Sequence, residues 1–263
     1  MEAVLLGSGS SAGTPIIGCG CPVCTSNDPR DRRTRASLWV RGQAGESLLV
    51  DTSTDLRHQA LREGMDRVDA VFLTHTHADH INGIDDMRAF NGLQEQVIPV
   101  YGRPSVLEAA EQRFHYCFGE APPPEKGWYI PVLEPRPLSE PLDWGGLHVT
   151  PIPVEHGRWS IYGYRFNDLA YITDAKTVPE ASLELLGGLD VLILDCLRYR
   201  DHPTHMRVEE AVATAERIGA KRTIFTHFTH DVAFNRLAQE LPEGMEPGYD
   251  GLRVAVGEGW GGT

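Results

Sequence analysis

Short blocks of apolar residues, some alternating with polar ones, recur along the chain and predict a series of β-strands. These blocks lie at residues 4–6, 37–40, 47–50, 70–73, 148–153, 161–166, 169–173, 191–194 and 222–225. Helical periodicity is found at 56–63, 79–90, 105–118 and 208–218. Proline and glycine are concentrated in residues 119–146, which predicts a surface excursion. Because strands alternate with helices, we expect an α/β protein with two helix-covered sheets in one domain, residues 1–263.

Composition narrows the function classes. The 263 residues are 41% hydrophobic, which suits a buried core, and 37 acidic against 24 basic residues give a net charge of −13. This balance weighs against a general nucleic-acid binder, and bound divalent cations would offset part of it. Neither a membrane-length apolar run nor a signal peptide is evident, so a cytoplasmic location, where thiols stay reduced, is the expectation.

The densest group of metal-ligand residues follows the predicted strand at 70–73. It comprises His75, His77, Asp79 and His80. Side chains alternate along an extended chain, so His75 and His77 point to the same side and can share one metal. Asp79 would open the next helix and, with His80, face a second metal. A polar turn with surface histidines is the alternative, but the spacing HxHxDH strongly favours metal binding.

Further ligands must come from other strand ends. His156, Asp174 and His227 each stand where a predicted strand ends or has just ended. The two oxygens of Asp174 suit a bridge between two cations about 3.5–4 Å apart. Each residue alone is an ordinary polar terminus, but together they supply what an open dinuclear site lacks.

This order of residues resembles the metallo-β-lactamase-fold hydrolases. The resemblance implies a four-layer αββα sandwich, with Asp174 shared between two metals. It implies that the first metal is held by His75, His77 and His156, and the second by Asp79, His80 and His227. Asp51, after an early strand, matches an aspartate that supports the metal loop in this family, where it would accept a hydrogen bond from a ligating histidine.

Three cysteines are clustered near the N-terminus in the stretch GCGCPVC. Three thiolates lack one ligand of a tetrahedral zinc site, and a histidine close after His227 can supply it. The predicted structural zinc site is therefore formed by Cys19, Cys21, Cys24 and His230. A CxxC redox pair and unligated thiols are the alternatives. Cys117 and Cys196 lack such partners and are expected to be buried as small hydrophobes.

Together, CxCPxC and the C-terminal THxxHD are similar to the PhnP-type cyclic phosphodiesterases, which carry a third, structural zinc. This resemblance implies a metal-dependent phosphodiesterase acting on a small cyclic phosphodiester, such as phosphoribosyl cyclic phosphate, with two catalytic divalent metals, Mn or Zn. A further histidine is implicated there as a proton donor; His205 matches it by spacing, and His202 is the substitute. The expected catalytic residues are His205, Asp79 and Asp174.

Other readings stay open. The PQQ-biosynthesis B proteins are also similar at CxCxxC, and the same ligands suit glyoxalase II-type thioester hydrolysis, an oxygen-dependent reaction or tRNase Z-type RNA processing. A non-catalytic metal-binding interaction module would be expected to have lost a ligand, and none is missing. The expected partner is a small-molecule substrate, with homodimerisation left open.

The candidate phosphate anchors are Arg88, Arg158, Arg198 and Arg200, each of which alone is better explained as a surface charge.

Overall fold

The computed structural model describes residues 1–120 and 127–257. Over these residues the strands form two sheets of seven, with the orders β14-β1-β2-β3-β4-β5-β6 and β13-β12-β11-β10-β9-β8-β7. The first sheet contains β1 (Glu2–Gly7), β2 (Ser37–Arg41), β3 (Ser47–Val50), β4 (Ala70–Phe72), β5 (Ile98–Gly102), β6 (Leu133–Pro137) and β14 (Leu252–Ala255). The second contains β7 (Leu142–Trp144), β8 (Leu147–His156), β9 (Trp159–Phe166), β10 (Leu169–Ile172), β11 (Val191–Asp195), β12 (Arg222–Thr226) and β13 (Met245–Pro247).

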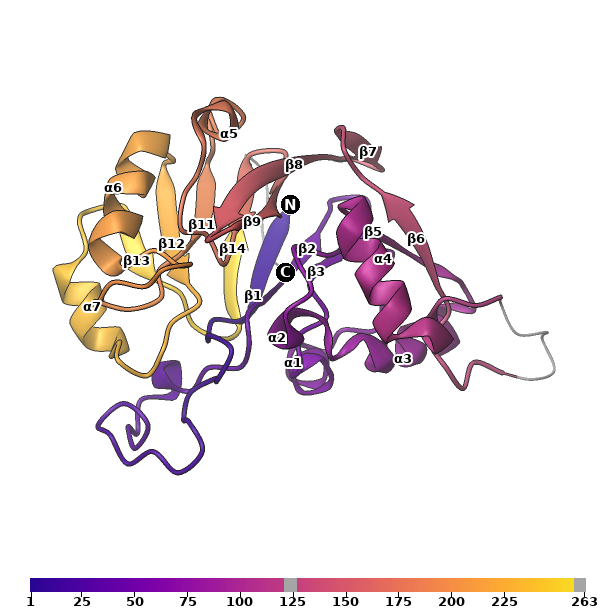
Figure 1. Ribbon diagram of the computed structural model, residues 1–263, viewed down its shortest axis with the longest axis horizontal. Coiled ribbons are helices and arrows are strands. Elements are labelled where there is room, and N and C mark those ends of the chain that lie inside the picture. Colours follow the sequence, from indigo (N-terminus) through magenta and orange to yellow (C-terminus); the bar gives the residue numbers. More distant parts are fainter. Residues whose placement is uncertain (121–126, 258–263) are drawn as a thin grey trace.

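Helices cover the outer face of each sheet. They are α1 (Leu56–Glu63), α2 (Ala78–Ile81), α3 (Met87–Gln94), α4 (Pro104–Arg113), α5 (Glu180–Glu184), α6 (Val208–Ile218) and α7 (Phe234–Glu240). Figure 1 shows α1 to α4 on the side of the first sheet and α6 and α7 on the side of the second. Separate apolar clusters pack each helix layer against its sheet. The αββα sandwich predicted from the sequence is therefore confirmed.

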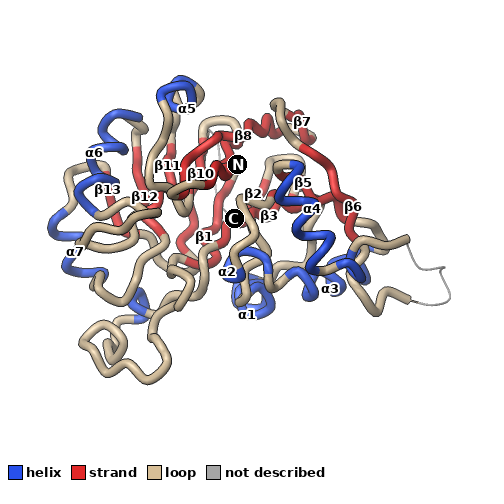
Figure 2. The backbone as a smooth tube through the Cα atoms, viewed as in Figure 1, coloured by secondary structure: helices blue, strands red, loops and turns tan. Residues whose placement is uncertain are grey.

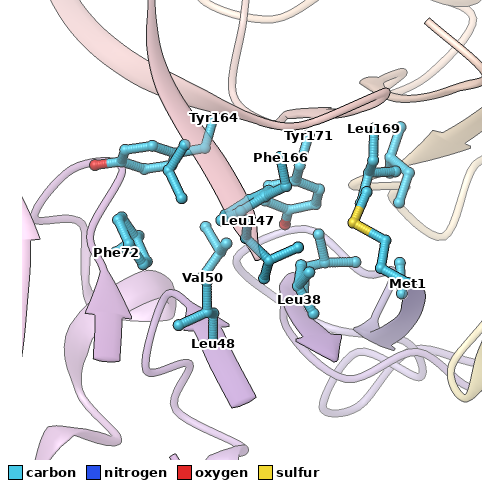
Figure 3. Close-up of a cluster of buried hydrophobic side chains, with 14 of the residues drawn as sticks. Met1, Leu38, Leu48, Val50, Phe72, Leu147, Tyr164, Phe166, Leu169 and Tyr171 are labelled. Carbon is cyan, nitrogen blue, oxygen red and sulfur yellow. The ribbon is translucent and has the colours of Figure 1, made fainter. Parts of the chain in front are cut away.

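The main core lies between the two sheets. Phe72 of β4 packs edge-on against Tyr164 and Phe166 of β9, with ring centroids 5.4 and 5.7 Å apart. Figure 3 shows these rings with Leu48, Val50 and other apolar side chains in the same layer. Edge-to-face aromatic pairs add to the stability gained from burial, so this contact fixes β4, which precedes the histidine-rich segment, against the opposite sheet.

Parallel pairing brings the ends of distant strands to one edge. In the first sheet β3, β4, β5 and β6 run parallel, and in the second β10, β11, β12 and β13 do. The carboxyl ends of parallel strands meet at the same edge of a sheet, where α/β folds commonly bind ligands. Asp51, Asp195 and His227 stand at or directly after such ends, and Asp174 stands two residues after one.

The single helix predicted at 79–90 is wrong. The segment divides into α2, a 3₁₀ turn at Ile84–Asp86 and α3. The cause is Gly83, whose N–H donates to Thr52 O at 2.9 Å and whose position for a Cβ lies 2.0 Å from Ser53 O. Because the two backbones touch there, α2 ends after one turn. The helix predicted at 105–118 likewise ends at Arg113, before a 3₁₀ turn at His115–Cys117.

Several strands were not predicted. β6 and β7 lie within the segment interpreted as a surface excursion, of which residues 121–126 fall outside the described part of the chain. β6 has the sequence LEPRP and β13 the sequence MEP, and both are edge strands. Proline cannot donate to a ladder and is tolerated at sheet edges, so proline-rich composition did not exclude strands here.

A long loop from residue 8 to 36 connects β1 with β2 and projects from the sandwich (Figure 2). It is held against the C-terminal half by Arg33, which is 3% exposed and donates to the carbonyls of Thr229 and Val232. Ser10 N–H donates to Phe228 O, and Phe228 N–H donates to Ser8 O. Among the described helices, none has the length and apolar character needed to cross a bilayer.

Candidate metal centre

Three residues at strand ends adopt left-handed backbone conformations. Asp51, Asp174 and His227 have φ values of 62°, 56° and 65°. This region is costly for residues other than glycine, and such strain is concentrated at functional sites. Asp51 follows β3, and His227 follows β12 directly. The turn at each residue directs its side chain into the space above the strand ends.

The first predicted ligand group is brought together. His75, His77, His156 and Asp174 each offer an atom such that all four atoms lie within 4.8 Å of one another. His75 Nε2 lies 3.0 Å from His77 Nδ1 and 3.8 Å from Asp174 Oδ1. His77 precedes α2 with an extended backbone, φ −64° and ψ 151°, so the alternation expected for His75 and His77 is present.

The second predicted group also converges. One ligand atom from each of its residues lies within 4.8 Å of the others; the residues are Asp79, His80, Asp174 and His227. Oδ2 of Asp174 lies 3.1 Å from His80 Nε2 and 3.3 Å from His227 Nε2, while Oδ1 faces the first group. The two oxygens of Asp174 thus address different groups, as expected of a bridging carboxylate.

The donor set fits a pair of divalent cations. His80 Nε2 and both ring nitrogens of His227 are buried without a hydrogen-bond partner in the described structure. Buried polar atoms are rarely left unpaired, so these nitrogens need another partner. Imidazole and carboxylate ligands suit Zn²⁺ and Mn²⁺.

Burial and neighbouring charges shift the pKa values of the clustered side chains, often in opposite directions. Burial lowers the pKa of His80, but the carboxylates of Asp174 and Asp51 outweigh it and raise that pKa well above its usual value. Burial and the neighbouring His80 hold the pKa of His75 well below its usual value. Burial raises the pKa of Asp174, yet the surrounding histidines lower it well below the ordinary range.

Asp51 supports the histidine segment, as its position in the sequence indicated. Its Oδ2 lies 2.7 Å from His80 Nδ1, and its oxygens accept from the backbone N–H and hydroxyl of Thr74, both at 2.8 Å. The side chain is fully buried. A carboxylate on Nδ1 fixes the tautomer with that nitrogen protonated, so His80 Nε2 is free to act as a ligand.

His205 lies beside the candidate metal centre. Its ring is stacked on that of His227 with centroids 4.9 Å apart, and its Nε2 is 3.8 Å from Asp174 Oδ1. Its Nδ1 is 3.3 Å from Asp195 Oδ1. Burial lowers the pKa of His205, but Asp195 more than offsets this and the net shift is upward. His202, the alternative candidate for the proton donor, accepts a hydrogen bond at Nδ1 from the N–H of Thr204 at 3.3 Å.

Sequence reasoning missed Asp195. This buried residue ends β11, and its Oδ1 faces both His205 Nδ1 and His227 Nδ1, at 3.3 and 3.4 Å. Its Oδ2 accepts from Met206 N–H at 3.0 Å. The signal was present, because Asp195 closes an apolar strand in the same way as the aspartates that were selected.

The predicted zinc ligands form a separate cluster. Sγ atoms of Cys19, Cys21 and Cys24 lie 3.3, 3.5 and 3.5 Å from His230 Nδ1. A hydrogen bond from the backbone N–H of Cys24 lowers the pKa of Cys21 to about 6, whereas burial raises the pKa of Cys24 to about 11. Cys117 and Cys196 are fully buried, as expected.

Of the four candidate phosphate anchors, three have other partners. Arg88 pairs with Asp85, Arg200 pairs with Asp231, and Arg198 donates to the carbonyls of Arg200 and Asp201. Arg158 is exposed at the tip of the β8–β9 hairpin.

Comparisons with known proteins decide the family. Residues 46–228 match the Beta-lactamase superfamily domain. The chain belongs to the β-lactamase superfamily. A diphosphatase from the PhnP family has a crystal structure that superposes with a TM-score of 0.89 at 40% identity, covering 97% of this chain and 98% of that one. The resemblance to the metallo-β-lactamase fold and to PhnP-type proteins is thus confirmed.

Two curated relatives carry other names. An octanoyltransferase from Porphyromonas gingivalis is 38% identical over 98% of this chain, but the match spans only 52% of that protein. A coenzyme PQQ synthesis protein B from Methylobacterium radiotolerans is 33% identical over 74% of this chain and 72% of its own length. The family and the clustered ligand residues together support a metal-dependent hydrolase.

Proposed function

We propose that this protein is a phosphodiesterase that hydrolyses a small, cyclic phosphodiester such as phosphoribosyl cyclic phosphate. The observation that carries the proposal is the position of His205, with Nε2 at 3.8 Å from Asp174 Oδ1 and Nδ1 facing Asp195. A diester with an alkoxide leaving group needs a proton donor beside the metals, because the alkoxide is too basic to depart unaided.

The ligand residues would hold two divalent cations, Mn or Zn, which when bound neutralise phosphoryl oxygens and make a water molecule more acidic. Asp174 serves both positions, and Asp51 orients His80. His156 donates from Nδ1 to Thr204 O at 2.9 Å, which leaves its Nε2 for the first group. His205 donates a proton from Nε2 to the leaving oxygen while Asp195 stabilises the charged ring.

The test compares His205→Ala with wild type on two diesters of different leaving group. We expect kcat on a ribose cyclic phosphate to fall about 10²- to 10⁴-fold, the usual contribution of acid catalysis. Turnover of bis(p-nitrophenyl) phosphate should fall far less, because nitrophenolate leaves without a proton. Equal losses on both substrates would contradict the acid role.

A second candidate is hydrolysis of a diphosphate, which the 40% identical diphosphatase of the PhnP family favours. A phosphate leaving group is less basic than an alkoxide, so the same site needs less help from His205. If a dinucleotide diphosphate is the better substrate and His205→Ala barely slows its turnover, this candidate replaces the first. An octanoyl thioester belongs in the same panel, because the longer relative is named an octanoyltransferase.

We further propose that Cys19, Cys21, Cys24 and His230 hold one structural zinc ion. Four ligands would close its coordination shell, so the ion would tie the N-terminal loop to the segment that follows His227 rather than bind substrate.

A further inference from the structure

A hairpin tip stands directly over the first ligand group. β8 ends at His156 and β9 begins at Trp159, and these two residues face each other across the turn. Gly157 has a φ of 63°, and a Cβ there would lie 2.7 Å from Thr204 Cγ2. The tip therefore packs tightly against the loop that carries His205, and its position relative to the site is fixed.

Trp159 is 47% exposed in spite of its size. Its ring centroid lies 4.9 Å from that of His77 and 6.1 Å from that of His156. Tryptophan is highly buried on average, so a half-exposed ring beside two candidate ligands is an available surface at the mouth of the site.

The neighbouring Arg158 supplies a positive charge at the same place. Its guanidinium carbon lies over one face of the Trp159 ring, 5.8 Å from the ring centroid, so a base would stack on the other face. Over residues 1–120 and 127–257, Arg158 is exposed and takes part in no ion pair, and its side chain contacts the Trp159 ring. Other arginines near the mouth are engaged: Arg103 donates to Ser160 O at 2.7 Å, and Arg113 donates to Thr76 O at 2.6 Å.

We propose that Trp159 and Arg158 form a nucleotide subsite, in which Trp159 stacks on the base and Arg158 contacts a phosphate outside the scissile bond. Stacking on an aromatic side chain accepts any base, because every base has a π-face. The inference rests on the proposed function and adds to it a preference, among small phosphodiesters and diphosphates, for those that carry a nucleobase. Because the Trp159 ring lies 4.9 Å from the ring of His77, a nucleotide whose base stacks on Trp159 would have its phosphates beside the metal ligands.

A purely structural role for Trp159 makes a different prediction. If the ring only screens His77 and His156 from water, its loss should weaken metal retention and affect every ligand alike. A stacking role predicts loss of affinity only for ligands with a base. The two roles are separated by comparing ligands that share a phosphate and differ in the base.

The experiment measures binding of AMP and of ribose 5-phosphate to the metal-loaded protein by calorimetry. Wild type should bind AMP about 5- to 100-fold more tightly than ribose 5-phosphate. Trp159→Ala should bind both with similar affinity and keep its metals, whereas Trp159→Phe should retain most of the preference. Tyr129→Ala, which removes another exposed aromatic ring (79% exposed), is the control and should retain it fully.

Absence of a preference for AMP in wild type, or a preference that survives Trp159→Ala, overturns the proposal. Equal weakening of both ligands together with metal loss overturns it in favour of the screening role. Because binding is measured without turnover, a protein that prefers AMP but hydrolyses no phosphodiester would contradict the proposed function and leave the subsite standing.

Discussion

At the scale of single residues, Asp195 links the candidate acid to a candidate metal ligand. Its Oδ1 faces both His205 and His227, while its Oδ2 is fixed by the N–H of Met206. One carboxylate therefore hydrogen-bonds the ring of His205 and contacts the ring of His227, and these two rings are stacked on each other. A change at Asp195 should disturb the acid and the metal ligand together, without direct contact with substrate.

We predict that Asp195→Asn lowers turnover of a ribose cyclic phosphate about 10- to 100-fold, the usual cost of losing an orienting partner of this kind. The amide is similar in size and still accepts from Met206 N–H, so the fold should persist. Asp190→Asn, which changes an aspartate at the other end of β11, is the control. Turnover of Asp195→Asn within twofold of wild type would contradict this role.

Residue type and spacing identified the ligand residues because HxHxDH and polar strand ends are local features. The convergence of Asp174, His227 and the histidine segment then followed from parallel pairing. Trp159 could not be selected, because the sequence does not reveal whether an aromatic residue in a strand faces the core or the mouth of a site.

At the scale of elements, the β8–β9 hairpin and the 202–205 loop act as a unit. His156 Nδ1 donates to Thr204 O, and Gly157 lies against the Thr204 side chain. Helix α2 is short for a comparable reason, since Gly83 meets the backbone of Ser53. Such contacts join segments that are distant in the sequence, and periodicity does not reveal them. For this reason the periodicity predicted an uninterrupted helix at 79–90.

We predict that Gly157→Ala destabilises the protein more than Gly188→Ala. Both glycines have positive φ, 63° and 74°, but a Cβ at Gly188 meets nothing within 4 Å. Gly188→Ala should cost about 1–2 kcal/mol from backbone strain alone. Gly157→Ala should cost about 1–3 kcal/mol more from the clash with Thr204. Urea unfolding measures both, and equal costs would show that the tip is not tightly packed.

At the scale of the whole molecule, the N-terminal loop is attached to the C-terminal half by two means. One is the predicted zinc cluster, and the other is the buried Arg33 with its bonds to Thr229 and Val232. Because Arg33 remains when a thiol is removed, loss of zinc should loosen the loop without unfolding the sandwich.

We therefore predict that Cys24→Ser lowers the metal content by about one ion per chain and speeds proteolysis within residues 8–36. Turnover should fall less than with a change at Asp174. Cys117→Ala, which removes a buried thiol outside the cluster, should leave the metal content unchanged. An unchanged metal content in Cys24→Ser would exclude the zinc site.

The central claim is that distant strand ends hold two cations around Asp174 and act on a phosphodiester. Its most direct test is metal analysis of the purified chain, combined with turnover of a ribose cyclic phosphate, for wild type and Asp174→Asn. Wild type should contain about three divalent metals per chain and turn over substrate, and Asp174→Asn should lose about two metals and nearly all activity. A wild-type chain with one metal or fewer and no diesterase turnover would contradict the account.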